Sequence, residues 1–240
     1  MERTKAPRRR IRRLMLAGLV WLVVLYLLGA AFAPQVRSRG GQGARARTSS
    51  ENPESWLDPV LGDVVTMITH QDNGVWGHNS QKGRVRCWSR VGWKTQQAKW
   101  TRRYGRTRGP LDAWRSFTIG VPRREIELSP NVCGELSTLQ NDPLPVWRSD
   151  SAYALAYAVG ALAHEARHFA GALDEWSTEC YGMQSIRDVA VKLGRTPKEG
   201  RYLASLYWKQ IYPRESLAYR MPQCRNGGEF DLRPHSDAWP

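Results

Sequence analysis

The hydrophobic and polar positions separate an N-terminal apolar run from a longer part with short periodic patterns. Residues 14–33 carry no charge, and their length matches the ~20 residues that a membrane-spanning helix needs. Residues 1–13 before them are strongly basic, whereas residues 34–55 after them are rich in Gly, Arg and Ser without an apolar period. The pattern predicts a basic cytoplasmic end, a transmembrane anchor and a flexible tether.

A cleaved signal peptide is the alternative interpretation of the apolar run. Ala31 and Ala33 form a small-x-small cleavage signature, but Pro34 would follow the cut, and the run is long for a signal peptide. We therefore favour an anchor, with the C-terminal domain outside the cytoplasm at the cell membrane. Cleavage would instead give a secreted protein.

Residues 56–240 are numerous enough for one domain with a substantial core. Their periodicity predicts an α+β fold, a mainly helical single domain with a small sheet upstream of its longest helices. Helices are predicted at residues 56–68, 94–104, 131–139 and 197–212, strands at residues 84–89, 117–121 and 124–128, and a loop-like tail at residues 213–240.

Two further helices carry the chemistry of the chain. Residues 151–170 are mostly small and apolar, which predicts a buried helix that Gly171 terminates. A second helix is predicted from Asp174, its N-cap, to Gly194. The chain must reverse between the two helices.

The first of these helices contains the pattern H-E-x-x-H, formed by His164, Glu165 and His168. Residues four apart on a helix share one face, with Cβ atoms roughly 5–6 Å apart, so both imidazoles can reach one metal ion. A buried helix with three such polar groups also needs partners for them, and a metal provides these partners. We expect one zinc ion at this position, with Glu165 placed to hold a water molecule.

Residues 161–180 resemble the active-site helix and the following segment of the zincin superfamily of zinc metallopeptidases. The resemblance implies a zincin-like metallopeptidase domain at residues 56–240 and a peptide or protein substrate. It also implies hydrolysis by zinc-activated water with Glu165 as general base. Arg167 departs from the family pattern, because zincins usually leave this inner position uncharged.

A third zinc ligand is needed, and the candidates are Asp174, Glu175 and Glu179. We favour Glu175 as the ligand with Glu179 orienting a ligand histidine, which resembles the gluzincins. Asp174 as the ligand would resemble the aspartate-type metzincins, which need a methionine turn that Met183 would have to supply. Glu179 as the ligand is the remaining alternative.

Zincins also have an edge strand upstream of the metal helix, along which an extended substrate binds by strand addition. The resemblance suggests residues 124–128 for this role, and an ordinary core strand is the alternative. A hydrogen-bond donor for the developing oxyanion is also needed, and the sequence leaves four candidates open. These are Tyr181, Tyr207, Tyr212 and Tyr219. The histidines at positions 70, 78 and 235 are interpreted as surface residues.

All four cysteines follow the tether, which predicts two disulfides in a segment outside the cytoplasm. Four cysteines allow three pairings, and we favour Cys87–Cys133 and Cys180–Cys224. The second pair would hold the C-terminal tail beside the helix with Glu175 and Glu179. Cys180 as a zinc ligand is the competing interpretation.

The net charge of +14 raises the question of nucleic-acid binding. Residues 1–47 hold 11 basic residues and 1 acidic residue, whereas the remaining 25 basic and 21 acidic residues leave a surplus of only +4. A nucleic-acid partner is therefore not expected. Two other hypotheses remain: a cell-wall glycan-binding module that uses the 11 tryptophans, or a catalytically inactive, zinc-stabilised cell-surface protein.

Overall fold

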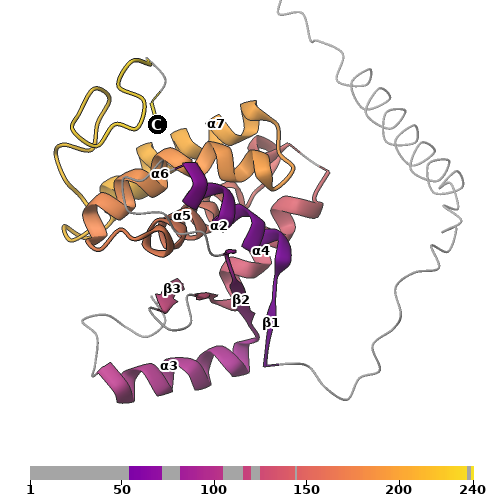
Figure 1. Cartoon of the computed structure of the whole chain (residues 1–240). Coiled ribbons are helices and arrows are strands. Elements are labelled where there is room, and N and C mark those ends of the chain that lie inside the picture. Colours follow the sequence, from indigo (N-terminus) through magenta and orange to yellow (C-terminus); the bar gives the residue numbers. More distant parts are fainter. Residues whose placement is uncertain (1–53, 72–81, 105–115, 120–124, 144, 237–238) are drawn as a thin grey trace, which may run out of the picture. The chain divides into compact units, whose positions relative to one another are not determined.

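The computed structural model describes residues 54–71, 82–104, 116–119, 125–143, 145–236 and 239–240 (Figure 1). These residues belong to one compact unit, residues 51–240, which is mainly helical with a small sheet. This confirms the α+β class. The predicted anchor and almost all of the tether lie outside the described residues, and none of the described helices is long and apolar enough to cross a membrane.

The sheet has four strands in the order β1-β2-β4-β3. Its outer pairs, β1 with β2 and β3 with β4, are antiparallel, whereas β2 and β4 in the middle are parallel. The strands are β1 (Ser55–Leu57), β2 (Val85–Trp88), β3 (Ser116–Ile119) and β4 (Glu125–Leu128).

Two sequence expectations about the sheet are wrong. The predicted helix at residues 56–68 begins only at Pro59, because Trp56 and Leu57 pair with β2 and the carboxylate of Asp58 caps the helix by accepting from the amides of Val60 and Leu61. The strand at residues 124–128 is not an edge, because β4 pairs with β2 on one side and β3 on the other. No substrate can add to β4.

The helices follow the predicted order with shifted ends. They are α2 (Pro59–Gln71), α3 (Arg90–Tyr104), α4 (Pro130–Asn141), η2 (Val146–Arg148), α5 (Ala152–Ala170), α6 (Glu175–Lys192), α7 (Pro197–Leu206), η3 (Tyr207–Ile211) and η4 (Tyr212–Arg214). The single helix expected at residues 197–212 is α-helical only to Leu206; η3 is a π-helical turn and η4 a 3₁₀ turn.

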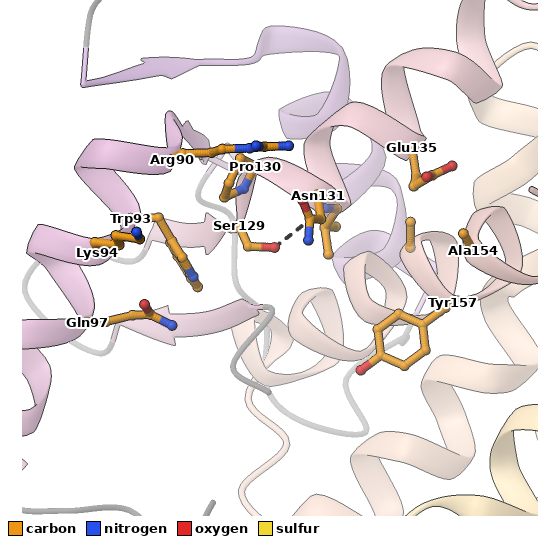
Figure 2. Close-up of a pocket in the computed structure, with 12 residues that line it drawn as sticks. Arg90, Trp93, Lys94, Gln97, Ser129, Pro130, Asn131, Glu135, Ala154 and Tyr157 are labelled. Atoms are coloured by element: carbon orange, nitrogen blue, oxygen red, sulfur yellow. Dashed lines mark hydrogen bonds between the residues drawn. The ribbon is translucent and has the colours of Figure 1, made fainter. Parts of the chain in front are cut away.

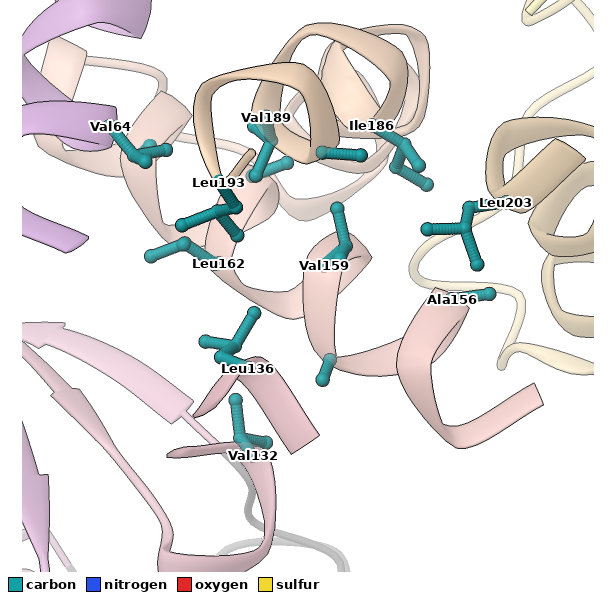
Figure 3. Close-up of a cluster of buried hydrophobic side chains, with 14 of the residues drawn as sticks. Val64, Val132, Leu136, Ala156, Val159, Leu162, Ile186, Val189, Leu193 and Leu203 are labelled. Atoms are coloured by element: carbon teal, nitrogen blue, oxygen red, sulfur yellow. The ribbon is translucent and has the colours of Figure 1, made fainter. Parts of the chain in front are cut away.

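The core is built around α5, which packs against α2, α4 and α6 and against strands β3 and β4. Its apolar side chains are buried on nearly all sides, as expected of a helix inside a domain. Figure 3 shows Val159 and Leu162 of α5 between Val132 and Leu136 of α4 and the apolar side chains of α6. This packing gives α5 and α6 a fixed relation to each other.

The two faces of the sheet differ. Val85, Cys87, Ile126 and Leu128 point into the core, and the alternate residues form a polar face that includes Glu125 and Glu127 of β4. Glu125 forms ion pairs with Arg84 and Arg86, and the indole of Trp88 donates to Glu127 at 3.1 Å. Burial raises the pKa of Glu127 to about 7, although its hydrogen bond with Trp88 opposes the shift.

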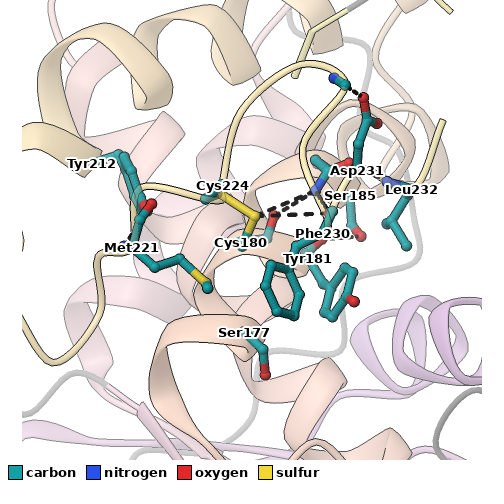
Figure 4. The surroundings of a disulfide bond; sticks show 12 residues. Ser177, Cys180, Tyr181, Ser185, Tyr212, Met221, Cys224, Phe230, Asp231 and Leu232 are labelled. Atoms are coloured by element: carbon teal, nitrogen blue, oxygen red, sulfur yellow. Dashed lines mark hydrogen bonds between the residues drawn. A yellow bond between two sulfur atoms is a disulfide. The ribbon is translucent and has the colours of Figure 1, made fainter. Parts of the chain in front are cut away.

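Both predicted disulfides are present. Cys87–Cys133 links β2 to α4, and Cys180–Cys224 links α6 to the C-terminal tail (Figure 4). Gln184 of α6 binds the same tail, because its side chain donates to the carbonyl of Phe230 and accepts from the amide of Leu232. The described part of the tail after η4 has neither helix nor strand, so these contacts hold it on α6.

Candidate metal centre

A reversal of the chain brings the two predicted metal-binding segments together. Gly171 ends α5 with a positive φ of 124°, a conformation that favours glycine, and its amide bonds back to the carbonyl of Arg167. Asp174 then caps α6 by accepting from the amide of Ser177 at 2.9 Å. As a result, Glu175 at the start of α6 faces the histidines of α5.

Three side chains converge on one point. The Nε2 atoms of His164 and His168 lie 3.1 Å and 3.3 Å from the same oxygen, Oε2 of Glu175. All three candidate ligand atoms lie within 4.8 Å of one another. Ligands of a tetrahedral zinc ion at about 2.0–2.1 Å are separated by roughly 3.3 Å, so the arrangement fits such an ion.

Each histidine is oriented by a partner on its other ring nitrogen. His168 Nδ1 donates to the carbonyl oxygen of Ala172 at 2.9 Å, and His164 Nδ1 lies 2.8 Å from Oε2 of Glu179. A carbonyl and a carboxylate both accept, so both imidazoles carry their proton on Nδ1. Nε2 is therefore the nitrogen of each ring that can bind a metal, once any proton on it is displaced.

The electrostatics of the three candidate ligands are strongly coupled. Burial alone would lower the pKa of His164, but Glu175 and Glu179 outweigh it and raise the pKa to about 10. The pKa of His168 is also raised, because Glu175 again outweighs burial. Both histidines hold the pKa of Glu175 well below its usual range. Without a metal ion, protons on the histidines supply the positive charge beside Glu175.

The alternative third ligands have other roles. Asp174 is the cap of α6, and Glu179 holds the far side of His164. Met183 is buried within the continuous helix α6, so it does not form the turn that a metzincin-like site needs. Cys180 is in a disulfide and is therefore not a zinc ligand. Among these acids, Glu175 is the one that converges with both histidines, and Glu179 contacts the other ring nitrogen of His164.

Glu165, the expected general base, is buried on α5 beside His164. Its negative charge raises the pKa of His164, His168 and Tyr219, which places it near all three. It is not among the three converging ligands. Glu165 is therefore a further acid close to the two histidines, outside the group of candidate ligands.

Arg167, which departs from the zincin pattern, contacts helix α6. Its guanidinium donates to the hydroxyl of Ser185 at 2.6 Å and interacts with Tyr181 and Asp188, all on α6. Burial lowers the pKa of Arg167 to about 10, so the side chain keeps its charge at neutral pH. The arginine therefore joins α5 to α6.

Among the four candidate tyrosines, Tyr219 is the one whose ring lies beside a ligand imidazole, 5.7 Å from that of His164. Tyr207 donates to Glu179, Tyr212 contacts the backbone of Met221, and Tyr181 packs against Phe230. Burial raises the pKa of Tyr219, and the charges of Glu175 and Glu165 add to the effect. Tyr219 therefore stays protonated and can donate a hydrogen bond.

Neither of the other two described histidines belongs to the group of candidate ligands. His70 and His235 are exposed, which agrees with the sequence interpretation, and His78 lies outside the described residues.

The apolar side chains of Leu173, Trp176 and Leu217 flank site residues in the sequence and are exposed to solvent. They were not recognised from the sequence, since single exposed apolar residues have no distinctive pattern.

A pocket of about 600 Å³ lies between α3, the start of α4 and the first half of α5 (Figure 2). Arg90, Trp93 and Lys94 line it from α3, and Tyr157 lines it from α5. Tyr157 precedes His164 by seven residues, so both lie on one face of α5 about 10 Å apart along its axis. The pocket and the metal centre therefore share one helix face.

Comparisons of the chain with models of known protein families, with curated proteins and with solved structures find no match.

Proposed function

We propose that this chain is a zinc-dependent metallopeptidase of the zincin type that hydrolyses peptide bonds outside the cytoplasm. The observation that carries the proposal is the convergence of His164 Nε2, His168 Nε2 and Glu175 Oε2 on one point. The charge of Glu165 acts on both of these histidines. Two imidazoles and one carboxylate are a donor set that suits zinc better than calcium or magnesium, which prefer oxygen ligands.

The residues around the site have the groups that peptide hydrolysis requires. A zinc ion held there would lower the pKa of a water molecule toward ~7 and polarise the carbonyl of the substrate. Glu165 accepts the proton of the attacking water and delivers it to the leaving amine. Tyr219 donates a hydrogen bond to the carbonyl oxygen as negative charge develops on it.

The openness of the site favours a catalytic role over a structural one. Structural zinc sites are usually closed by four protein ligands, whereas catalytic sites keep one position for water or substrate. The group found among the described residues has three ligands, and the side chain of Glu175 is 46% exposed. A zinc-stabilised protein without turnover therefore fits this site less well.

Strand β3 replaces β4 as the proposed strand for substrate binding. It lies at the edge of the described sheet and packs against α5, the helix that carries both histidines. An extended peptide that pairs with β3 would run beside α5 toward the metal. This assigns recognition of the peptide backbone to the sheet and the chemistry to the helices.

The proposed location rests on two features. Two disulfides fit an oxidising compartment, and residues 14–33 have the length and apolarity of a membrane anchor. A glycan-binding function has less support, because the exposed tryptophans of the described part, Trp56, Trp147 and Trp176, come from three separate elements, β1, η2 and α6.

The test is cleavage of a peptide library by the full chain, comparing wild type with Glu165→Gln. We expect wild type to cleave, and Glu165→Gln to retain zinc but lose about 10²–10⁴-fold in rate. Glu135→Gln on α4 is the matched control and should cleave like wild type. A zinc-loaded wild type that cleaves no peptide, or a Glu165→Gln variant with undiminished activity, would contradict the proposal.

A further inference from the structure

Glu179 connects the metal centre to a third helix. Its Oε2 accepts from His164 Nδ1 at 2.8 Å, and its Oε1 accepts from the hydroxyl of Tyr207 at 2.6 Å. Both Glu179 and Tyr207 are 4% exposed, so neither bond competes with bulk water. Each oxygen of the carboxylate therefore has one fixed partner.

A π-helical turn and close-packed glycines accompany the contact between Tyr207 and Glu179. Tyr207 begins the π-helical turn η3 directly after α7, and such turns are frequent at functional sites. Gly160 of α5 leaves space for its ring, because a Cβ there would lie 2.2 Å from Tyr207 Cε2. Gly182 of α6 similarly lies against the backbone of His164, where a Cβ would be 2.9 Å from Cα.

We propose that Tyr207 is a positioning residue of the metal centre, which acts through Glu179 on His164. This inference rests on the zinc site proposed above and deepens it. The hydroxyl fixes the plane of the Glu179 carboxylate, so that Oε2 points at His164 Nδ1 and not at the metal. Tyr207 thereby keeps the His164 lone pair on Nε2 and keeps Glu179 out of the ligand set.

The test compares Tyr207→Phe with Tyr212→Phe in the full chain. Each variant loses one hydroxyl and keeps its ring, but the hydroxyl of Tyr212 contacts only the backbone of Met221 among the described residues. Zinc affinity is measured by chelator competition. The coordination of the metal is followed by the visible absorption spectrum of the cobalt-substituted protein. Mutation of a residue that holds a metal-binding histidine typically lowers metal affinity 10–100-fold. Because Tyr207 acts on His164 only through Glu179, we expect Tyr207→Phe to lower zinc affinity about tenfold.

The expected result is weaker zinc binding and a shifted cobalt spectrum in Tyr207→Phe, with neither change in Tyr212→Phe. In a Glu179→Ala background, Tyr207→Phe should have no additional effect, because its route to His164 is gone. A wild-type zinc affinity and cobalt spectrum in Tyr207→Phe, or an equal effect with and without Glu179, would overturn the inference.

A second variant tests the same contact without removing the hydroxyl. Gly160→Ala forces the Tyr207 ring to move, so it should weaken zinc binding in the same way, and wild-type affinity in this variant would also contradict the role of Tyr207. Failure of wild type to bind zinc at all would instead contradict the proposed function. The two failures are therefore distinguishable.

Discussion

Two pairs of glutamates in this molecule differ in their partners. Glu175 and Glu179 on α6 face two imidazoles, whereas Glu125 and Glu127 on β4 face arginines and an indole. Guanidinium and indole groups only donate, so they satisfy a carboxylate without offering a lone pair to a metal. An imidazole can do both, since it donates from Nδ1 and, in its neutral form, has a lone pair on Nε2.

This difference explains why the same residue type has different chemistry at the two places. On α6 the carboxylates raise the pKa of His164, and His164 and His168 in turn hold the pKa of Glu175 well below its usual range. On β4 burial raises the pKa of Glu127 to about 7, so this carboxyl is partly protonated at neutral pH. The helical pair is suited to bind a cation, and the strand pair is suited to hold the sheet together.

The largest expected effect is on bound zinc, which should depend on the glutamate pair of α6 and not on the pair of β4. Glu175→Ala removes one of three ligands, so we expect bound zinc to fall from about one per chain to background, together with any hydrolysis. Glu127→Gln should retain zinc at the level of wild type. Elemental analysis of the purified proteins measures both. Asp174→Ala completes the comparison: full loss of zinc in this variant with retention in Glu175→Ala would reverse the assignment of the third ligand.

The next effect concerns Tyr219, which belongs to the helical site although it lies on the tail. Tyr219→Phe should retain zinc but lower kcat by about 10²–10³-fold, which is the typical loss when an oxyanion donor is removed. Tyr181→Phe on α6 serves as the control and should have wild-type kcat. Steady-state kinetics with a cleaved library peptide provides the measurement. An unchanged kcat in Tyr219→Phe would exclude the tyrosine as the donor.

A smaller effect is the pH dependence of zinc binding. Zinc must displace the proton of His164, whose pKa in the zinc-free protein is about 10, so zinc affinity should rise with pH. The slope below this pKa is about tenfold per pH unit for each displaced proton. Chelator competition at about pH 6 and about pH 8 measures it. A flat profile would show that zinc does not compete with this proton.

The smallest effect is on the stability of the zinc-free protein, where the two pairs act in different pH windows. The raised pKa of Glu127 means that its contribution to the free energy of unfolding is present below about pH 4.5 and is lost as pH rises to about 7. The contribution of His164 is present below about pH 6.5 and is lost as pH rises to about 10.

Denaturant titrations at a series of pH values distinguish these windows. Glu127→Gln should abolish the change in the free energy of unfolding in the lower pH window and leave the change in the upper window. Saturating zinc should abolish the change in the upper window, because the metal replaces the proton of His164. If the free energy of unfolding of Glu127→Gln still declines between about pH 4.5 and about 7, another group titrates in this range.

The sequence predicted the helical part of the site because its determinants are local. The spacing of His164 and His168, the stop at Gly171 and the cap at Asp174 together specify the reversal that brings Glu175 to the histidines. The resemblance to zincins suggested the roles that are proposed for Glu165 and Glu179. Both disulfide pairings were also anticipated from the order of the cysteines.

The parts that were missed depend on contacts between distant segments. The place of β4 inside the sheet is decided by its pairing with β2, about forty residues earlier, and no local pattern encodes this. Trp56 and Leu57 continue the apolar stripe of α2, so the sequence gives no sign that they enter β1 instead. The position of Tyr219 depends on how the Cys180–Cys224 disulfide and Gln184 hold the tail on α6.

The central claim is that His164, His168 and Glu175 bind one zinc ion, and the most direct test is the metal content of the purified full chain. The measurement compares wild type with His168→Ala after growth with zinc. We expect about one zinc per wild-type chain and background zinc in His168→Ala. Wild type without bound zinc, or equal zinc in both proteins, would contradict the claim.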